Sequence, residues 1–401
     1  MPPVAPPSEC RSVELFAGAG GLALGLARAG FRHEAVVERD AHAYATLLRN
    51  CALESSELVD WPVHRADVRE FDYAHIRPGI DLLAAGVPCQ PFSIGGKHLG
   101  PADPRNMFPE LVRAILALRP KAILLENVRG LARPSFARYF SYIQMIVCYP
   151  EIARRAREGW RDHLSRLERH HTAGRHGGLF YRMVFRVLNA ADYGVPQRRE
   201  RLIMVAIRGD LGVEWSFPRA THSEGALLHE QFVTGEYWDR HRVPRRQRPA
   251  AGAYRLNIAS GTGDLFGGKA EPWRTVRDAI SDLPKPEKGR SPAGLGQSHF
   301  QVPGARPYVG HTGSDLDRPA KTLKAGDHGV PGGENTLSLG SGAVRYFTVR
   351  ESARLQTFPD WFQFPGSWTE SMRQIGNAVP VRLAEVLASG VLAAVGGVRR
   401  V

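Results

Sequence analysis

Short apolar runs alternate with helical patterns over the first two hundred residues of the chain. Strand-like apolar runs occupy residues 12–17, 35–37, 81–85, 122–125 and 202–207. Apolar residues at helical spacing occupy 21–29, 41–50 and 108–118. Strands that alternate with helices predict βαβ units and a mostly parallel sheet, so we expect an α/β fold.

The pattern changes after about residue 210. Residues 214–345 are rich in Gly, Pro, Arg and His and hold few long apolar runs, whereas apolar helical spacing returns over 379–395. A chain of 401 residues exceeds the size at which a single core stops growing. We therefore expect a first domain at 1–213, a smaller irregular domain at 214–365, and a C-terminal segment at 366–401 that returns to the first domain.

The ends of the predicted strands carry residues suited to chemistry. In open parallel sheets, ligands bind at the carboxyl ends of the strands. Five glycine, acidic or thiol residues follow predicted or possible strands: Gly18, Glu38, Asp67, Cys89 and Glu126. We therefore expect the functional site to be built from these positions.

The first motif is ELFAGAGG at 14–21, a strand followed by a tight turn and a helix. Glycines let a backbone approach a ligand closely and adopt positive φ. Glu38 follows the turn by about 20 residues, where a carboxylate accepts hydrogen bonds from ribose hydroxyls. A dinucleotide-binding loop has the same appearance, and Glu38 or Asp67 taken alone is equally well explained as a solvated loop acid.

The second motif is GVPCQPFS at 86–93, directly after a buried strand. The flanking prolines fix where the thiol of Cys89 points. A thiolate is a strong nucleophile once its pKa is lowered, although a buried cysteine in a turn is the simpler alternative. The four cysteines form no CxxC pair, so we expect no disulfide framework and no metal site. Cys10, Cys51 and Cys148 are expected to fill the core.

Two further motifs carry charged residues next to strands. ENV at 126–128 ends an apolar run, so we expect partial burial of Glu126, which suits a carboxyl group to proton donation. YGVPQRRER at 193–201 precedes a strand and can place the guanidinium groups of Arg199 and Arg201 in a site. Taken singly, Glu126 is also an ordinary capping acid, and the arginines also form a basic loop.

The charge of the chain is strongly positive. The formal net charge is +13 and the sequence pI is about 9.9. Lys and Arg displace counterions from phosphates, so we expect a polyanionic partner, although an arginine-rich lineage also explains the charge. Residues 1–10 lack the basic and apolar regions of a signal peptide, and we find no apolar stretch of about 18 residues. We therefore expect a cytoplasmic protein without membrane contact.

Together these motifs resemble those of the DNA cytosine-C5 methyltransferase family in identity, order and spacing over nearly the whole chain. LFAGAGG resembles the family's cofactor loop, PCQPFS its nucleophile loop, ENV its acid block and QRRER its arginine block. RPAKTLKAG at 318–326 and RYFTVRESARLQTFPD at 345–360 resemble its late scaffold block. QIGNAVP at 374–380, by itself an ordinary turn, resembles its final cofactor-contact block. The resemblance implies a Rossmann-like S-adenosylmethionine-dependent methyltransferase fold with a smaller, irregular target-recognition domain at 214–365.

The resemblance also implies a role for each matching residue. Cys89 corresponds to the nucleophile that adds to C6 of cytosine, and Glu126 to the residue that holds N3 and the exocyclic amine. Arg201, and with it Arg199, correspond to arginines that hold the base O2 and order the active-site loop. The residues implied to contact the cofactor are Phe16, Gly18, Gly20, Glu38 at the ribose, Asp67 at the adenine, Asn377 and Val379.

The implied activity is methylation of C5 of a flipped-out cytosine in a specific duplex DNA sequence, through a covalent intermediate between Cys89 and C6. The implied cofactor is S-adenosyl-L-methionine, with S-adenosyl-L-homocysteine as product, and no metal is implied. The implied partner is double-stranded DNA, and a cognate restriction endonuclease is expected to act on the same site. We expect a monomer associated with the nucleoid.

Several alternatives stay open at this point. A tRNA cytosine-C5 methyltransferase of the same family would carry the same catalytic blocks, although the long second domain and the basic charge favour DNA. A catalytically silent DNA-binding protein would not need Cys89, Glu126 and Arg201 intact. An amino-group methyltransferase would use an Asp/Asn/Ser-Pro-Pro-aromatic block, which we do not find. A nicotinamide dehydrogenase would leave every block after the glycine loop unexplained.

Two features depart from the family pattern. Arg39 stands where some members carry an aromatic residue that stacks on adenine. The connection between the acid and arginine blocks is unusually long, and we treat about 134–178 as an insertion. Apolar residues at helical steps over 150–171 predict a helix there, with its other faces rich in arginine.

The predicted helix of the insertion has three interpretations. One is a docked surface helix with solvated arginines. The second is contact of Arg154, Arg157 and Arg161 with DNA phosphates beside the active-site cleft. The third, a metal site, is the least expected, and its candidate ligands are His163, His170, His171 and His176.

Overall fold

The computed structural model describes residues 10–397 apart from 55, 89–105, 175–176, 251–269, 290–297, 308–311, 326–334 and 341. The chain divides into two compact units. Unit 1 comprises Met1–Leu188, Glu200–Pro218 and Ala384–Val401, and unit 2 comprises Asn189–Arg199 and Arg219–Leu383. Unit 2 therefore takes in two segments, 189–199 and 366–383, that the predicted domain boundaries place elsewhere.

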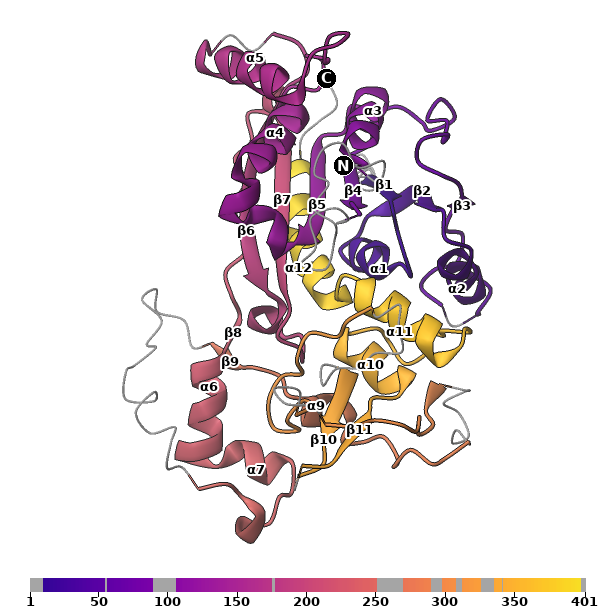
Figure 1. Cartoon of the computed structure of the whole chain (residues 1–401), viewed down its shortest axis with the longest axis vertical. Coiled ribbons are helices and arrows are strands. Elements are labelled where there is room, and N and C mark those ends of the chain that lie inside the picture. The colour runs from indigo at the N-terminus through magenta and orange to yellow at the C-terminus, as the bar shows by residue number, and fades with distance from the viewer. Residues whose placement is uncertain are drawn as a thin grey trace, which may run out of the picture. The chain divides into compact units, whose positions relative to one another are not determined.

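Unit 1 is built on a seven-stranded sheet with the strand order β3-β2-β1-β4-β5-β7-β6 (Figure 1). The strands are β1 (Arg11–Leu15), β2 (Arg32–Glu38), β3 (Val63–Arg65), β4 (Leu82–Gly86), β5 (Ala122–Val128), β6 (Tyr181–Asn189) and β7 (Glu200–Arg208). The strands from β3 to β5 pair in parallel, and β7 pairs antiparallel with β5. The predicted α/β fold with a mostly parallel sheet is confirmed.

The helices of unit 1 follow the predicted spacing closely. They are α1 (Gly21–Arg28), α2 (Ala41–Cys51), α3 (Phe108–Leu118), α4 (Ala137–Cys148), α5 (Trp160–Thr172) and, from Ala384 onward, α12 (Val381–Val395). The short helical turns η2 (Arg129–Ala132), η3 (Pro134–Phe136) and η5 (Gly209–Leu211) connect some of them. The predicted helices over 21–29, 41–50 and 108–118 are confirmed, because α1, α2 and α3 match them to within a residue at either end.

The centre of the sheet is buried on both faces. All five residues of β1 are buried, as are four of the five in β4 and six of the seven in β5. Side chains of a strand alternate between faces, so burial of consecutive residues means that both faces are covered. This is why β4 and the first four residues of β5 appear in the sequence as continuous apolar runs and not as alternating patterns.

His33 of β2 lies buried between β1 and α1. Its Nε2 donates to the carbonyl of Ala23 at 3.0 Å, which leaves Nδ1 to accept from the hydroxyl of Ser12 at 3.0 Å. Burial lowers the pKa of His33 to about 4, because the charged imidazolium is poorly solvated there. A neutral histidine therefore joins two strands and a helix beneath the glycine turn.

The insertion between β5 and β6 contains α4 and α5. Because α5 begins at Trp160, the arginines at 154, 155 and 157 lie in the connection before the helix, which corrects the helix predicted over 150–171. Glu151, in that connection, contacts Arg119 and accepts from the backbone of Leu179. The hydroxyl of Tyr181 donates to the carbonyl of Pro120 at 2.8 Å.

Residues 119 and 120 come just before β5, so these contacts fasten the insertion at the amino end of that strand. In Figure 1, α5 lies beyond the upper ends of β5 and β7. Glu126 lies near the other end of β5. The structure therefore does not support contact of the insertion's arginines with DNA beside the predicted active site.

The histidines of α5 take part in the packing of the insertion. His163 is buried and contacts the hydroxyl of Tyr142 and the carbonyl of Ile152, at 3.0 and 2.7 Å. His171 contacts the hydroxyl of Tyr149 at 2.6 Å. These bonds give both histidines a structural role. His176 lies outside the described residues.

Unit 2 is assembled from short elements. They are η4 (Ala190–Tyr193), β8 (His222–Ser223), α6 (Glu224–His229), η6 (Glu230–Thr234), α7 (Glu236–Arg240), η7 (Arg245–Gln247), β9 (Glu271–Pro272), α9 (Val276–Ile280), β10 (Thr336–Ser338), β11 (Val344–Tyr346), α10 (Val349–Leu355) and α11 (Trp368–Asn377). A small aromatic cluster includes Tyr237, Trp238 and Trp273. Capping boxes at Thr275 and Thr348 start α9 and α10.

One helical stretch, Trp368–Val395, is long and apolar enough to cross a membrane by length and composition. The expectation that no such stretch exists is therefore corrected. However, 56% of its apolar window is buried inside the structure, which is typical of a core helix of a globular protein.

We predict that stability depends on pH through His33. The unfolded chain protonates this residue near its ordinary pKa of 6.5, whereas the folded chain keeps it neutral down to about pH 4. The unfolded state therefore binds more protons in this window, and stability falls as the pH falls, by about 3 kcal/mol in total for this residue. Urea unfolding of the wild type and of His33→Gln at about pH 7 and about pH 4.5 measures the difference. The variant should lose less stability on acidification; an equal loss in both proteins would contradict the prediction.

Candidate active site

The parallel register of unit 1 brings three of the predicted motifs to one edge of the sheet. Leu15, the last residue of β1, pairs with Ala85 of β4, and Gly86 pairs with Glu126 of β5. A Cβ built on Gly86 would lie 3.7 Å from the carbonyl oxygen of Phe16 and 3.8 Å from Oε2 of Glu126. The glycine turn, the strand that leads to Cys89 and the acid of ENV therefore meet around Gly86.

The glycine turn that follows β1 has an unusual backbone. Phe16, Gly18 and Gly20 all have positive φ, at 58°, 56° and 83°. Phe16 in this region is uncommon for a residue with a side chain and is held by its surroundings. A Cβ at Gly20 would approach the side chain of Leu47 to 2.6 Å, so glycine is required there. α1 then begins without a side-chain cap, which leaves the amino end of a helix at the site.

Glu38, at the end of β2, holds the glycine turn in place. Its Oε2 accepts from the backbone N–H of Gly18 at 2.7 Å, and its Oε1 accepts from that of Asp40 at 2.6 Å. Burial raises the pKa of Glu38, and these two backbone bonds partly oppose that rise. The carboxylate therefore joins the first and second strand ends.

A second acid, Glu14, lies beneath the turn and was not singled out in the sequence. It is 1% exposed in the middle of β1, and its Oε2 has no hydrogen-bond partner. Burial raises the pKa of Glu14 well above its usual range, and the nearby Glu38 raises it further. The apolar neighbours Val13 and Leu15 on either side of Glu14 are the sequence signal that could have indicated its burial.

Asp67 is surrounded by arginine. Its carboxylate accepts from the backbone N–H and Nε of Arg69, at 3.0 and 2.9 Å, and from Nη2 of Arg69 at 2.6 Å. Nη1 of Arg39 donates to the same carboxylate at 3.0 Å. These bonds, above all those from Arg69, hold the pKa of Asp67 far below its usual range. A ligand amine that donates to Asp67 has to share the carboxylate with these arginines or displace one of them.

Glu126 forms an ion pair with Arg201 of the neighbouring strand β7. Nε of Arg201 lies 2.7 Å from Oε1 of Glu126, and both side chains are nearly buried, at 12% and 11% exposure. The expected burial of Glu126 is present, but its pairing with Arg201 was not predicted from the sequence. The adjacent Asn127 donates from Nδ2 to the carbonyl of Val87 at 3.1 Å, which fixes the start of the Cys89 motif against β5. The motif ENV contains Asn127, but its sequence alone indicated no role for this residue.

Cys89 itself lies outside the described residues, so its placement stays a prediction. The other cysteines are unsuited to nucleophilic chemistry, as expected of core residues. Burial raises the pKa of Cys51 to about 11 and that of Cys148 to about 12, and Cys10 is buried. The thiols of Cys51 and Cys148 therefore stay protonated at neutral pH.

Arg199, in unit 2, has a structural role. It is fully buried, and its guanidinium donates to the backbone carbonyls of Leu323, Gly376 and Ala378, at 3.0, 2.6 and 3.0 Å. A guanidinium committed to three carbonyls is not available to a substrate. This corrects the expectation that Arg199 contacts the base together with Arg201.

The same segment ties the late sequence blocks together through buried amides. Gln197 donates to Gln356 at 3.2 Å and accepts from the backbone of Leu323 at 3.0 Å. Gln356 in turn donates to the carbonyl of Ile375 at 2.7 Å. Gly376 is required, because a Cβ there would lie 2.3 Å from the backbone nitrogen of Ala325. The roles of these amides were not predicted, although both residues lie within the motifs QRRER and RYFTVRESARLQTFPD.

The last predicted cofactor residues lie at the end of α11. Asn377 is exposed and Val379 is buried within unit 2. Arg199 donates to the backbone carbonyls of the neighbouring residues Gly376 and Ala378. Contact of Asn377 and Val379 with a cofactor stays a prediction.

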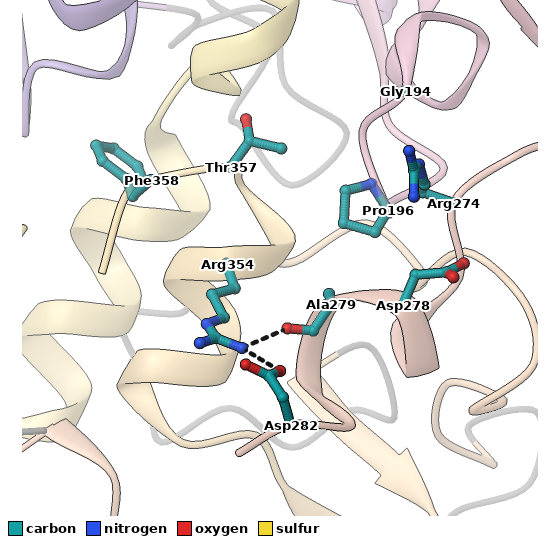
Figure 2. A pocket seen from close by; sticks show the side chains of 9 residues that line it. All are labelled: Gly194, Pro196, Arg274, Asp278, Ala279, Asp282, Arg354, Thr357 and Phe358. Carbon is teal, nitrogen blue, oxygen red and sulfur yellow. Dashed lines mark hydrogen bonds and ion pairs between the residues drawn. The ribbon is translucent and has the colours of Figure 1, made fainter. Parts of the chain in front are cut away.

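Unit 2 also contains an open pocket of about 410 Å³ (Figure 2). Its lining comprises Gly194, Pro196, Arg274, Asp278, Ala279, Asp282, Arg354, Thr357 and Phe358, none of which is a predicted site residue. Arg354 bonds there to Asp282 and to the carbonyl of Ala279, and it is also paired with Asp360. None of the residues that meet around Gly86 lines this pocket.

Comparison with known proteins links the chain to one family. The family profile described as C-5 cytosine-specific DNA methylase matches residues 10–145 and 175–392. The chain is 33% identical over 384 residues to the type II methyltransferase M.Eco47II of Escherichia coli, covering 95% of this chain and 78% of that protein. It is 34% identical over 390 residues to the type II methyltransferase M.NgoMIV of Neisseria gonorrhoeae, covering 96% and 97%.

Solved structures show the same fold. The S. pombe Dnmt2 methyltransferase aligns with a TM-score of 0.54 at 17% identity, over 96% of this chain and 98% of that one. The DNMT2 mutant from Spodoptera frugiperda aligns with a TM-score of 0.56 at 18% identity, over 96% and 99%. The predicted methyltransferase fold class is thereby confirmed.

We predict that Arg199 is needed for stability. In Arg199→Met the carbonyls of Leu323 and Gly376 lose the donor that Arg199 supplies, and that of Ala378 keeps only Gln356, which should lower the free energy of unfolding by about 3–5 kcal/mol. Hydrogen exchange should also become faster in residues 374–379. Arg199→Lys is the matched control: a single ammonium cannot span three carbonyls, so it should restore only part of the stability. Unfolding of Arg199→Met within about 1 kcal/mol of the wild type would rule out the structural role.

Proposed function

The chain belongs to the C-5 cytosine-specific DNA methylase family and is a DNA cytosine-5 methyltransferase, and on that basis we propose that it methylates a flipped-out cytosine in a specific duplex sequence through a covalent bond to Cys89. The observation that carries the proposal is the meeting of the glycine turn, the end of β4 and the Glu126–Arg201 pair around Gly86. The reaction class follows from the family and from the relatives in restriction-modification systems. The mechanism and the residue roles are our proposal.

The strand ends of unit 1 fit S-adenosylmethionine, which the family uses. Bound there, it would supply a methyl group activated on a sulfonium centre. The open amino end of α1 and the glycine turn offer backbone donors to the methionine end. Glu38 is placed to accept from ribose hydroxyls and Asp67 from the adenine amine, with Arg39 beside it. Asn377 and Val379 are the further proposed contacts.

The proposed reaction starts at Cys89, three residues after the end of β4. Its thiolate forms a bond to C6 of the cytosine, and the electron pair of the C5–C6 double bond makes C5 nucleophilic. C5 accepts the methyl group; the C5 proton then leaves to a base and the thiolate departs, which restores the double bond. The reaction leaves 5-methylcytosine in the DNA and the side chain of Cys89 free again.

Glu126 is proposed to hold N3 and the exocyclic amine of the cytosine during these steps. Its ion pair with Arg201 at 2.7 Å keeps the carboxylate in one position within a nearly buried setting. Arg201 is proposed to hold the base O2 from the same strand pair. A carboxylate–guanidinium pair offers both an acceptor and donors to the polar edge of one flipped base.

The proposed partner is duplex DNA, which the formal charge of +13 favours. Residues of unit 2, with candidates over 289–342, are proposed to read the sequence. A cognate restriction endonuclease is proposed to act on the same site, as the type II methyltransferases among the relatives suggest. We place the enzyme, as a monomer, at the nucleoid in the cytoplasm.

We predict that Cys89→Ser abolishes turnover and leaves cofactor binding within about threefold of the wild type, because the thiol acts on the base. Bisulfite sequencing of a plasmid from expressing cells first identifies the methylated site. The purified wild type should then form a denaturant-stable complex with a duplex that carries 5-fluorocytosine at that site, because fluorine cannot leave as a proton does. Substantial methylation by the Cys89→Ser protein, or no trapped complex with the wild type, would refute the covalent step.

We also predict that Glu38→Ala weakens binding of S-adenosylhomocysteine. Loss of hydrogen bonds from two ribose hydroxyls to a charged group should cost about 1–3 kcal/mol. Isothermal titration calorimetry measures this independently of turnover. Glu54→Ala, which removes an exposed acid from the connection after α2, is the matched control and should bind as the wild type does. If Glu38→Ala binds with unchanged affinity and has an unchanged melting temperature, Glu38 does not bind the ribose hydroxyls.

A further inference from the structure

The insertion carries a basic surface that the family profile does not cover. The profile leaves out residues 146–174. Within them, five arginine side chains are exposed, and we call these five the insertion surface: Arg154, Arg155, Arg157, Arg161 and Arg169. No ion pair joins any of the five to a carboxylate in the part of the chain that the structure describes. The insertion surface is thus an addition to the methyltransferase fold with unneutralised charge.

Three of the four acids around the insertion surface are paired with other arginines, and the fourth, Asp162 in the first turn of α5, is a single negative charge beside five arginines. Glu151 pairs with Arg119, and Glu158 pairs with Arg166 at 2.8 Å. Glu168 lies 3.9 Å from Arg138. The Glu158 pair is strong enough, with a bond from the backbone of Arg155, to lower the pKa of Glu158 to about 2. These acids therefore do not cancel the charge of the insertion surface.

The backbone that carries the arginines is held in one conformation. Arg166 donates to the carbonyl of Ala153 at 2.8 Å while it binds Glu158. His163 contacts the carbonyl of Ile152 at 2.7 Å. These two contacts hold the connection before α5 against the packed helix, so the backbone that carries the arginines is fixed. Positioned arginines lose less freedom on binding than mobile ones, which favours a role in recognition.

The part of the insertion surface that lies on α5 is also positively charged. Arg161 and Arg169 are eight residues apart on α5, which places them on one side of the helix about 12 Å apart along its axis. The opposite side buries His163, Leu164 and Leu167. The guanidinium of Arg161 lies 5.3 Å from the centre of the Trp160 ring, which holds it in place.

The insertion surface is distant from the proposed active site within unit 1. The insertion is fastened to residues 119 and 120, and Glu126 lies six residues further along, about 20 Å for an extended strand. Figure 1 shows α5 beyond the ends of β5 and β7 that lie opposite the carboxyl end of β5. About 20 Å exceeds the reach of an arginine side chain, so these arginines do not contact the phosphates beside a cytosine that occupies the site around Gly86.

We propose that the insertion surface binds the phosphates of a second stretch of duplex DNA, apart from the stretch that is methylated. Arginine is suited to bidentate phosphate contacts, and phosphate contacts add affinity without reading sequence. A protein partner fits less well: protein interfaces need buried apolar anchors, and none of the large exposed apolar side chains among the described residues lies in the insertion. The surface would keep the enzyme on long DNA between turnovers.

The test uses the full-length protein and a duplex of about 60 alternating A·T base pairs, which contains no cytosine and so offers no target base to the methylation site. The variant is R154Q/R155Q/R157Q. The slope of log K against log salt should shrink by roughly 0.9 for each phosphate that the protein no longer neutralises, or by about 2–3 for all three arginines. Affinity at physiological salt should fall about tenfold or more.

The matched control is R154K/R155K/R157K, which keeps the positive charge and should retain most of the salt slope. R161Q/R169Q is a second variant on the helical part and should also reduce the slope. Turnover on a short duplex that carries the methylated site should be unchanged in all three variants. A glutamine variant with wild-type melting temperature and an unchanged salt slope would overturn the proposal, and would leave an acidic protein as the remaining partner. Because the probe lacks cytosine, this result is independent of whether Cys89 is the nucleophile.

Discussion

The parallel register of four strands, β2, β1, β4 and β5, is the constraint on which the rest of unit 1 depends. Parallel strands point their carboxyl ends the same way, so residues that are far apart in the sequence meet at one edge. Phe16, Gly86 and Glu126 come together for this reason alone. A shift of one residue in any pair would turn side chains to the other face and separate the motifs.

That edge concentrates charge, and each charge is stabilised differently. Glu38 is held by two backbone N–H groups, Glu126 by the guanidinium of Arg201, and Asp67 by two exposed arginines. Glu14 has an unpartnered oxygen and a raised pKa, which favours the neutral acid. Only Asp67 depends on partners that a ligand can displace without breaking the fold, because Arg39 and Arg69 are exposed while the partners of Glu38 are backbone.

Unit 2 has little regular secondary structure, so many of its backbone groups need hydrogen-bond partners from side chains. Arg199, Gln197 and Gln356 supply donors to backbone carbonyls at helix ends and in loops. An arginine has five donors in a planar fork, so one side chain can hold three chain segments. The motif QRRER thus combines two physical roles: Arg199 builds unit 2, and Arg201, two residues later, pairs with the acid of unit 1.

The sequence by itself determined the α/β class, five strands and three helices of unit 1, and the family, because apolar spacing and local motifs depend on neighbours in the chain. It did not predict α4 or β6. It also identified Glu38 and Glu126 as the acids at strand ends. It could not separate Arg199 from Arg201, since adjacent arginines look alike until burial decides their partners. It placed the start of α5 too early, and one of its three interpretations put the arginines of the insertion beside the site, because helical spacing says nothing about which end of β5 the insertion is fastened to. Those outcomes rest on contacts between residues far apart in the chain, such as Arg199 with Gly376 and Glu151 with Arg119, which only the tertiary structure decides.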